Sequence, residues 1–137
     1  YILRTTGENT PLADVRVRRA INLAVDREEV VALLGGMAAP AQGMVLPDSP
    51  WFGKPSFRIR HDPAEARRLL AEAGYGPGNP LRIRFLISAS GSGQMQPLPM
   101  NELVQQHMRA VGIELSFEVV EWNAMRVQRG KGPLDPS

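Results

Sequence analysis

The stretch Ser88–Pro97 holds the densest group of side chains that could bind a polar ligand. It combines serine hydroxyls and glutamine amides, which both donate and accept hydrogen bonds, with glycines that let a backbone approach a ligand closely. The candidate ligand-binding residues in this stretch and just after it are Ser88, Ser90, Ser92, Gln94, Gln96 and Asn101. The alternative that the sequence leaves open is a flexible Gly/Ser connector without a ligand role.

Further candidates lie at two other places in the chain. Glu121 and Asn123 follow a predicted strand, where Glu121 is either a polar cleft residue or an exposed strand cap. Trp51 lies in a proline-rich loop, where a large aromatic ring can serve as a ligand platform or as a packing anchor. Trp122 is expected to seal the end of the strand instead.

The elements that must position these residues follow from periodicity. Alternating apolar residues predict strands at about 81–87 and 113–120, and a 3.6-residue apolar period predicts a helix over 100–111. A strand–helix–strand order implies a right-handed crossover and parallel strands. Ligands in open α/β sheets bind at the carboxyl ends of the strands. The sequence therefore predicts an α/β fold with a small mixed sheet and a parallel βαβ unit. A ligand cleft is expected at the carboxyl ends of the two strands, where the polar stretches that start at Ser88 and at Glu121 follow.

Helix signals dominate the first half of the chain. Residues 14–34 predict two helices end to end, with Asp26 as the cap of the second and a Gly-Gly pair at its end. Asp62 predicts the start of a further helix, which Gly74 ends. The apolar residues of the first helix, Val17, Ala20, Ile21 and Ala24, form one stripe that is expected to be buried.

Several chemistries are excluded by the residues present. The Gly/Ser loop lacks the Gly-Lys-Ser/Thr ending of a phosphate loop. No nucleophile–base pair can be named, so we expect no catalytic residue and no cofactor. The two histidines have no third ligand at useful spacing, and cysteine is absent, so we expect no metal site. Arginines are interleaved with acids, which argues against nucleic acid as a partner. No apolar run reaches the ~20 residues of a membrane span, so we expect no membrane insertion of this segment.

The chain also resembles a known family in several segments that occur in the family's order. The first is Asp14-Val-Arg-Val-Arg-Arg-Ala-Ile-Asn-Leu-Ala-Val-Asp-Arg27. The later ones are Ala39–Pro47 with Ser49-Pro-Trp51, then His61–Tyr75, Gln105–Ile113 and Val119-Val-Glu-Trp122. These segments are similar to the second lobe of the bacterial extracellular solute-binding proteins of family 5. That family holds the peptide, nickel and oligosaccharide receptors of ABC importers.

The resemblance implies a periplasmic-binding-protein-like lobe in a periplasmic or other extracytoplasmic location. Residues 1–137 are then expected to form a single domain, an incomplete lobe of a larger two-lobe protein whose signal peptide lies upstream. Its implied partners are a small polar solute, for which a peptide is one candidate, and an ABC importer permease reached through the full-length protein. The family's loop can present an arginine to a peptide carboxylate, but no arginine or lysine occurs between Ser88 and Asn101.

Two alternatives of other classes remain at this stage. One is a stand-alone α/β protein-interaction module that uses the proline-rich loop 36–60. The other is a small hydrolase that uses the serine-rich loop.

Overall fold

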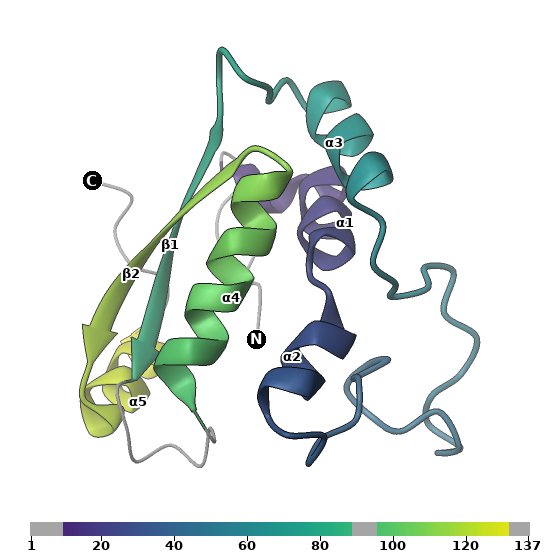
Figure 1. Cartoon of the computed structure of the whole chain (residues 1–137), viewed down its shortest axis with the longest axis vertical. Helices are drawn as coiled ribbons and strands as arrows, with labels where there is room; N and C mark the ends of the chain where they lie inside the picture. Colours follow the sequence, from purple (N-terminus) through teal and green to yellow (C-terminus); the bar gives the residue numbers. More distant parts are fainter. Residues whose placement is uncertain (1–9, 89–95, 132–137) are drawn as a thin grey trace.

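Two parallel strands with a helix packed across them form one half of the molecule (Figure 1). The computed structural model describes residues 10–88 and 96–131. Strand β1 spans Leu81–Ser88, β2 spans Ile113–Val120, and helix α4, Pro97–Ala110, connects them. The register pairs Leu81 with Ile113 and Ser88 with Val120. The predicted parallel βαβ unit is therefore confirmed.

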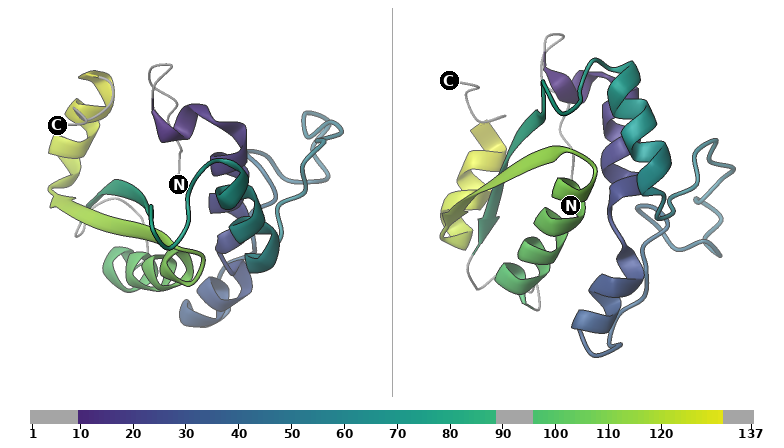
Figure 2. Two further views of the ribbon diagram at one scale, coloured as in Figure 1. Left: turned by 90° about the horizontal axis from the view of Figure 1, so that it is seen from above. Right: turned by 45° about the horizontal axis from the view of Figure 1, so that its top comes forward.

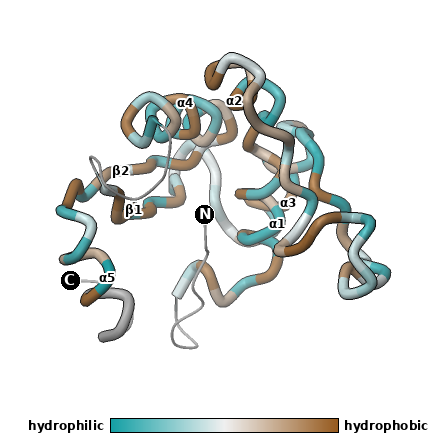
Figure 3. Tube along the Cα trace, turned by 90° about the horizontal axis from the view of Figure 1, so that it is seen from below, coloured by the Kyte–Doolittle hydropathy of each residue, from teal (hydrophilic) through white to brown (hydrophobic). Residues whose placement is uncertain are grey.

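The two faces of this sheet are covered by different helices (Figures 2 and 3). Helix α4 packs against the face that carries the alternating apolar residues, and its Val104 and Met108 belong to the core cluster with Leu81 and Ile113. Helix α5, Trp122–Lys131, lies beyond the opposite face and contacts β1. On that second face Arg82 Nε donates to Glu114 Oε2 across the strands at 2.8 Å, an exposed pair worth little to stability.

The other half of the molecule consists of short helices. A 3-10 turn, Pro11–Ala13, leads into helix α1, Val15–Ala24, then α2, Arg27–Leu33, and α3, Pro63–Glu72. Helices α1 and α3 pack side by side and share one buried cluster with the sheet and α4. The cluster consists of Val17, Ala20, Ile21, Leu23, Ala24, Ala66, Leu69, Leu70, Leu81, Val104, Met108, Val111, Ile113 and Leu115. The predicted stripe on α1 is confirmed.

The predicted caps have the expected geometry. The Asp26 carboxylate accepts hydrogen bonds from the backbone N–H groups of Glu28 and Glu29 at 3.0 and 3.1 Å. Asp62 accepts from the Glu65 N–H at 3.0 Å. Gly35 and Gly36 follow α2 with φ of 66° and 75°, a conformation that L-residues with side chains rarely adopt. Among the helices of the described ranges, none is long and apolar enough to cross a membrane.

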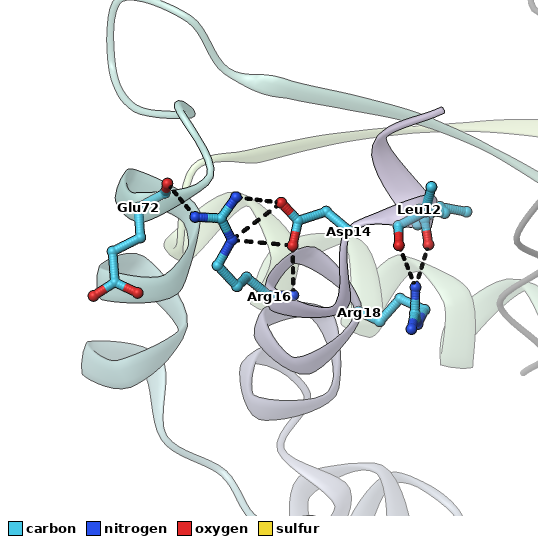
Figure 4. Close-up of polar contacts among 6 residues, drawn as sticks. Leu12, Asp14, Arg16, Arg18 and Glu72 are labelled. Carbon is cyan, nitrogen blue, oxygen red and sulfur yellow. Dashed lines mark hydrogen bonds and ion pairs between the residues drawn. The ribbon is translucent and has the colours of Figure 1, made fainter. Parts of the chain in front are cut away.

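Two arginines of the Asp14–Arg27 phrase, Arg16 and Arg18, hold the start of α1 in place (Figure 4). The Arg16 guanidinium pairs with the Asp14 carboxylate at 2.6 Å and donates to the backbone carbonyl of Glu72 at 2.6 Å, at the end of α3. Arg18 donates to the carbonyls of Leu12 and Ala13, both at 2.8 Å. These contacts give the two arginines a structural role, and they tie α1 to the turn before it and to α3.

Replacing Asp26 by Ala is expected to lower the free energy of unfolding by about 1 kcal/mol at neutral pH, because the first turn of α2 loses its cap. The hydrogen bond from the Glu29 N–H is the main reason that the pKa of Asp26 lies below its ordinary value of 3.8. A carboxyl whose pKa is lowered by folding stabilises the fold above its unfolded pKa. That contribution is lost as the pH falls through the folded-state pKa. Urea unfolding of both forms between pH 7 and pH 2 measures the difference.

Asp26→Ser is the matched control, because the serine hydroxyl keeps the cap but does not titrate in this range. The difference between the original chain and the Ala variant should shrink below about pH 4, whereas the difference between the Ser and Ala variants should not. An Ala variant whose deficit is constant down to pH 2 would contradict the assignment.

Candidate functional site

The carboxyl ends of both strands and the start of α4 meet at one end of the sheet. Ser88 ends β1 beside Val120, and Glu121 follows Val120 directly. Helix α4 starts at this end because a crossover helix runs antiparallel to the strands it connects. Of the polar residues expected to line a cleft, Ser88, Gln96, Asn101, Glu121 and Asn123 lie on the segments that meet here. Ser90, Ser92 and Gln94 lie outside the described residues.

Ser88 is the last residue of β1, and its side chain is fully buried. Its Oγ has no hydrogen-bond partner within the part of the chain that the structure describes. A buried hydroxyl in this condition costs roughly 1–3 kcal/mol relative to one that is hydrogen-bonded. The burial was not foreseen, since the sequence indicated an exposed loop residue.

Asn101 presents a second polar atom of the same kind. Only 3% of the residue is exposed, and its Nδ2 donates to the Pro97 carbonyl at 2.5 Å. That carbonyl can only accept, so the bond fixes which way the amide points. Its Oδ1 is left as an acceptor without a partner among the described residues. Ser88 and Asn101 therefore hold two unused buried polar atoms on either side of the connection between β1 and α4.

No capping or acidic side chain of the first turn of α4 occupies the positions that a ligand could take at this end of the sheet. Its N-cap residue, Gln96, is exposed and makes no side-chain capping bond, and the turn contains no acidic residue. The positive end of the helix dipole is thus not neutralised by the helix's own side chains. Pro97 and Pro99 have no N–H, so the turn has fewer backbone donors than an ordinary helix start. The site is suited to side-chain hydrogen bonds more than to a backbone anion cradle.

Glu121 and Asn123 are exposed, and Glu121 has a structural task. Its carboxylate accepts from the backbone N–H groups of Asn123 at 2.8 Å and Ala124 at 3.3 Å, which caps α5. Asn123 Nδ2 also donates to Glu121 Oε1 at 3.3 Å. Of the two roles that the sequence left open, the structure shows a cap, of α5 and not of the strand, and a role of Glu121 in the cleft stays a prediction. The exposed Asn123 side chain remains at the edge of the site.

Helix α5 itself was not predicted. Its described apolar residues are few, and only Trp122 and Met125, three positions apart, suggest a buried helical face. Met125 is buried and Trp122 half-buried. A carboxylate immediately before such a pair was the available signal, because Glu at that position can accept from the first free N–H groups of a helix.

Trp51 is not brought to this end of the sheet. The loop 36–60 projects on the far side of α1 and α2 from the strand ends (Figures 1 and 2). Trp51 is 85% exposed there. In this structure Trp51 therefore does not lie with Ser88 and Glu121 around one cleft, and a role of Trp51 in ligand binding stays a prediction. The order of elements along a sequence does not say on which side of the helices a 25-residue loop will lie.

A shallow hollow occupies the opposite end of the sheet. It measures about 180 Å³ and is lined by Arg82, Gln105, Arg109, Ile113, Glu114, Leu115 and Ser116. Gln105 Nε2 donates to the Leu115 carbonyl at 2.6 Å, which covers part of the edge of β2. The hollow lies at the amino ends of the strands, where ligands of open α/β sheets do not bind. Sequence reasoning did not find this hollow, because only the packing of α4 against the sheet brings Gln105 and Arg109 next to the start of β2.

Both histidines are paired with carboxylates between α2, α4 and the start of α3. His61 Nδ1 lies 3.1 Å from Asp26 Oδ2, His107 Nε2 lies 2.7 Å from Glu29 Oε2, and the two ring centroids are 6.2 Å apart. Within the described ranges no group of three or more His, Cys, Asp or Glu side chains is arranged to hold a metal ion. These contacts connect the helical half of the molecule to α4.

Comparison with known proteins matches residues 1–135 to the model of the bacterial extracellular solute-binding proteins, family 5 Middle. One relative is di/tripeptide-binding protein 2 of Pseudomonas aeruginosa (strain UCBPP-PA14). It is 33% identical over 122 residues, which make up 88% of this chain and 22% of the relative. The chain thus spans less than a quarter of that relative's length.

Solved structures match the fold as well. The dipeptide-binding protein of Pseudoalteromonas sp. SM9913, in complex with Met-Leu, superposes with a TM-score of 0.79 at 26% identity, over 93% of this chain and 25% of that one. NikA from Brucella suis, in complex with Fe(III)-EDTA, gives a TM-score of 0.76 at 28% identity, over 91% and 27%. The α/β architecture predicted from the sequence is that of these structures.

Proposed function

We propose that this chain, which belongs to the bacterial extracellular solute-binding proteins of family 5, forms one wall of the binding site of an ABC-importer receptor. The family consists of binding proteins and not of enzymes, and its members act outside the cytoplasm. The rest of the polypeptide would supply the opposite wall, and the two parts would close over the solute by hinge motion. The full-length receptor would then deliver the solute to a membrane permease.

The observation that carries this proposal is the pair of buried, unpartnered polar atoms at the carboxyl end of β1 and the start of α4. Most buried polar atoms in native structures have a partner, and those without one call for an explanation. Ser88 Oγ can donate or accept, whereas Asn101 Oδ1 can only accept. Ser88 lies on the face of β1 that α5 covers and Asn101 lies on α4, so each atom would take a separate N–H or O–H group of a solute bound at this end of the sheet. Asn123 and Gln96, which are exposed on the segments that meet at the same end of the sheet, are the proposed outer contacts.

The proposed solute is small and polar, with a peptide as one candidate. Acceptors such as Asn101 Oδ1 suit the N–H groups of a peptide or an amine. The absence of arginine and lysine between Ser88 and Asn101 argues against a clamp for a peptide carboxylate in this loop. One structural relative holds Fe(III)-EDTA and another holds Met-Leu, so the architecture is compatible with more than one class of solute.

Isothermal titration calorimetry of the full-length receptor and of residues 1–137 tests the proposal, with Met-Leu and a set of di- and tripeptides as first probes. One wall cannot exclude water from a solute as an enclosed pocket does. We therefore expect residues 1–137 to bind no better than about millimolar, which corresponds to about 4 kcal/mol. The full-length protein should bind at least ~100-fold more tightly. Equal affinity of the two proteins would contradict a site shared between two walls.

A further inference from the structure

The loop that leaves Trp51 far from the strand ends carries a concentration of exposed apolar side chains. Residues 37–51, here called the apolar arm, contain five of them: Met37, 73% exposed, Met44, 92%, Val45, 40%, Leu46, 72%, and Trp51, 85%. Exposed apolar residues scattered singly over a surface are normal, whereas five within fifteen consecutive residues indicate an interaction surface. The arm projects from the body of the molecule beside α1 and α2 (Figures 1 and 2).

The arm has local structure of its own. The Ser49 N–H donates to the Leu46 carbonyl at 3.0 Å, and the Phe52 N–H donates to the Ser49 carbonyl at 3.0 Å. The Phe52 ring lies so close to Gly43 that a Cβ there would be 3.5 Å from it. Prolines 40, 47 and 50 further restrict the backbone. A segment restricted in this way loses little conformational entropy when a partner covers it.

The arm is also almost without charge. From residue 36 to residue 57 the only charged side chains are Asp48 and Lys54. Transient protein–protein interfaces are about as polar as the rest of a protein surface, whereas permanent interfaces have an apolar core depleted of charges. The composition of the arm therefore fits a permanent interface better than a transient one.

We infer that the apolar arm is an intramolecular docking surface, covered in the full-length receptor by the part of the same polypeptide that lies outside residues 1–137. The inference rests on the proposed function, in which this chain is one part of a longer receptor. The chain accounts for 22% and 25% of the lengths of two relatives, so most of such a polypeptide is available to cover the arm. A small solute could contact only a few of these five side chains, and it would need polar partners that the arm scarcely provides.

Methionine oxidation in the full-length receptor measures whether the arm is covered. Hydrogen peroxide converts accessible Met to the sulfoxide, and mass spectrometry of tryptic peptides assigns a rate to each position. If the arm is docked, Met44 and Met37 should oxidise at least ~10-fold more slowly than free methionine. The buried Met108 provides the internal reference for full protection. The measurement is made with and without solute and at two protein concentrations.

Each alternative occupant gives a different result and overturns the inference. Oxidation rates near that of free methionine in every condition would show that the arm is exposed in the receptor, as expected if an external protein such as the permease binds it. Protection that appears only with solute would make the arm part of the binding site. Protection that grows with protein concentration would indicate a second copy of the receptor. A receptor that protects Met44 yet binds no tested solute would retain the inference while removing support from the proposed function.

A pair of substitutions gives a second readout in the full-length receptor. Leu46→Ser removes an apolar side chain from the inferred interface and should lower the melting temperature and accelerate oxidation of Met44. Gln42→Ser changes an exposed polar residue of the same arm and should do neither. Equal melting temperatures and equal Met44 rates in the two variants would overturn the inference.

Discussion

Replacing Leu23 by Ala is expected to lower the free energy of unfolding of this chain by about 2–5 kcal/mol, the usual cost of truncating a buried leucine. Only 1% of Leu23 is exposed, and it belongs to the cluster shared by α1, α3, α4 and both strands. The loss combines the transfer free energy of the removed atoms with the cost of the cavity that remains. The Leu23 carbonyl also accepts the Asp62 N–H at 2.9 Å, which ties this position to the start of α3.

Leu33→Ala is the matched control, because it makes the same chemical change on the neighbouring helix α2. Leu33 is 41% exposed, so the control should cost clearly less than the Leu23 variant. Urea unfolding followed by far-UV circular dichroism gives both values. Similar losses in the two variants would mean that α1 is not the centre of the core.

The difference between these two leucines shows what periodicity can and cannot predict. The stripe of Val17, Ala20, Ile21 and Ala24 was found from sequence, because one buried face repeats every 3.6 residues. Leu23 lies outside that stripe, yet it is equally buried. Helix α1 contacts both α3 and α4, so more than one of its faces is covered. A second covered face depends on tertiary packing, which a local pattern does not encode.

The sheet was predicted more completely than the helices next to it. Strands β1 and β2 agree with the expected ranges to within one residue, because apolar alternation is a strong signal over eight positions. Helix α4 begins at Pro97, three residues before its predicted start. Proline looks like a helix breaker in sequence, but in the first turn its absent N–H costs nothing.

The structure brings several candidate site residues to one end of the sheet and buries two of them, Ser88 and Asn101, and their role in binding stays a prediction. Topology alone places Ser88 and Glu121 next to each other, since parallel strands end at the same edge. Whether Ser88 and Asn101 are buried depends on how α4 and α5 pack over that edge, and α5 was not foreseen. Trp51 was assigned to the same cleft because a large aromatic ring in a proline-rich loop can serve as a ligand platform. The structure differs because no local signal determines the path of a long loop.

Substituting the two buried polar residues by apolar ones is expected to stabilise the receptor while weakening its binding of solute. An unpartnered buried polar atom costs roughly 1–3 kcal/mol, so Ser88→Ala and Asn101→Leu should each raise the free energy of unfolding by about 1 kcal/mol. The Pro97 carbonyl does not lose its helical partner in the second variant, because backbone N–H groups of the same turn remain. A gain in stability together with a loss of function is the pattern expected of a functional polar site.

The affinity of the full-length receptor should fall by ~10-fold in each variant, about 1.4 kcal/mol for one lost hydrogen bond to the solute. The two losses should be nearly additive, if each residue contacts a separate group of the solute. Ser56→Ala and Gln106→Leu are the matched controls, since they make the same kinds of change at exposed positions and should alter neither quantity. Thermal melting gives the stability and calorimetry gives the affinity. If the variants at 88 and 101 lose stability and keep their affinity, the two polar atoms belong to the fold and the solute binds elsewhere.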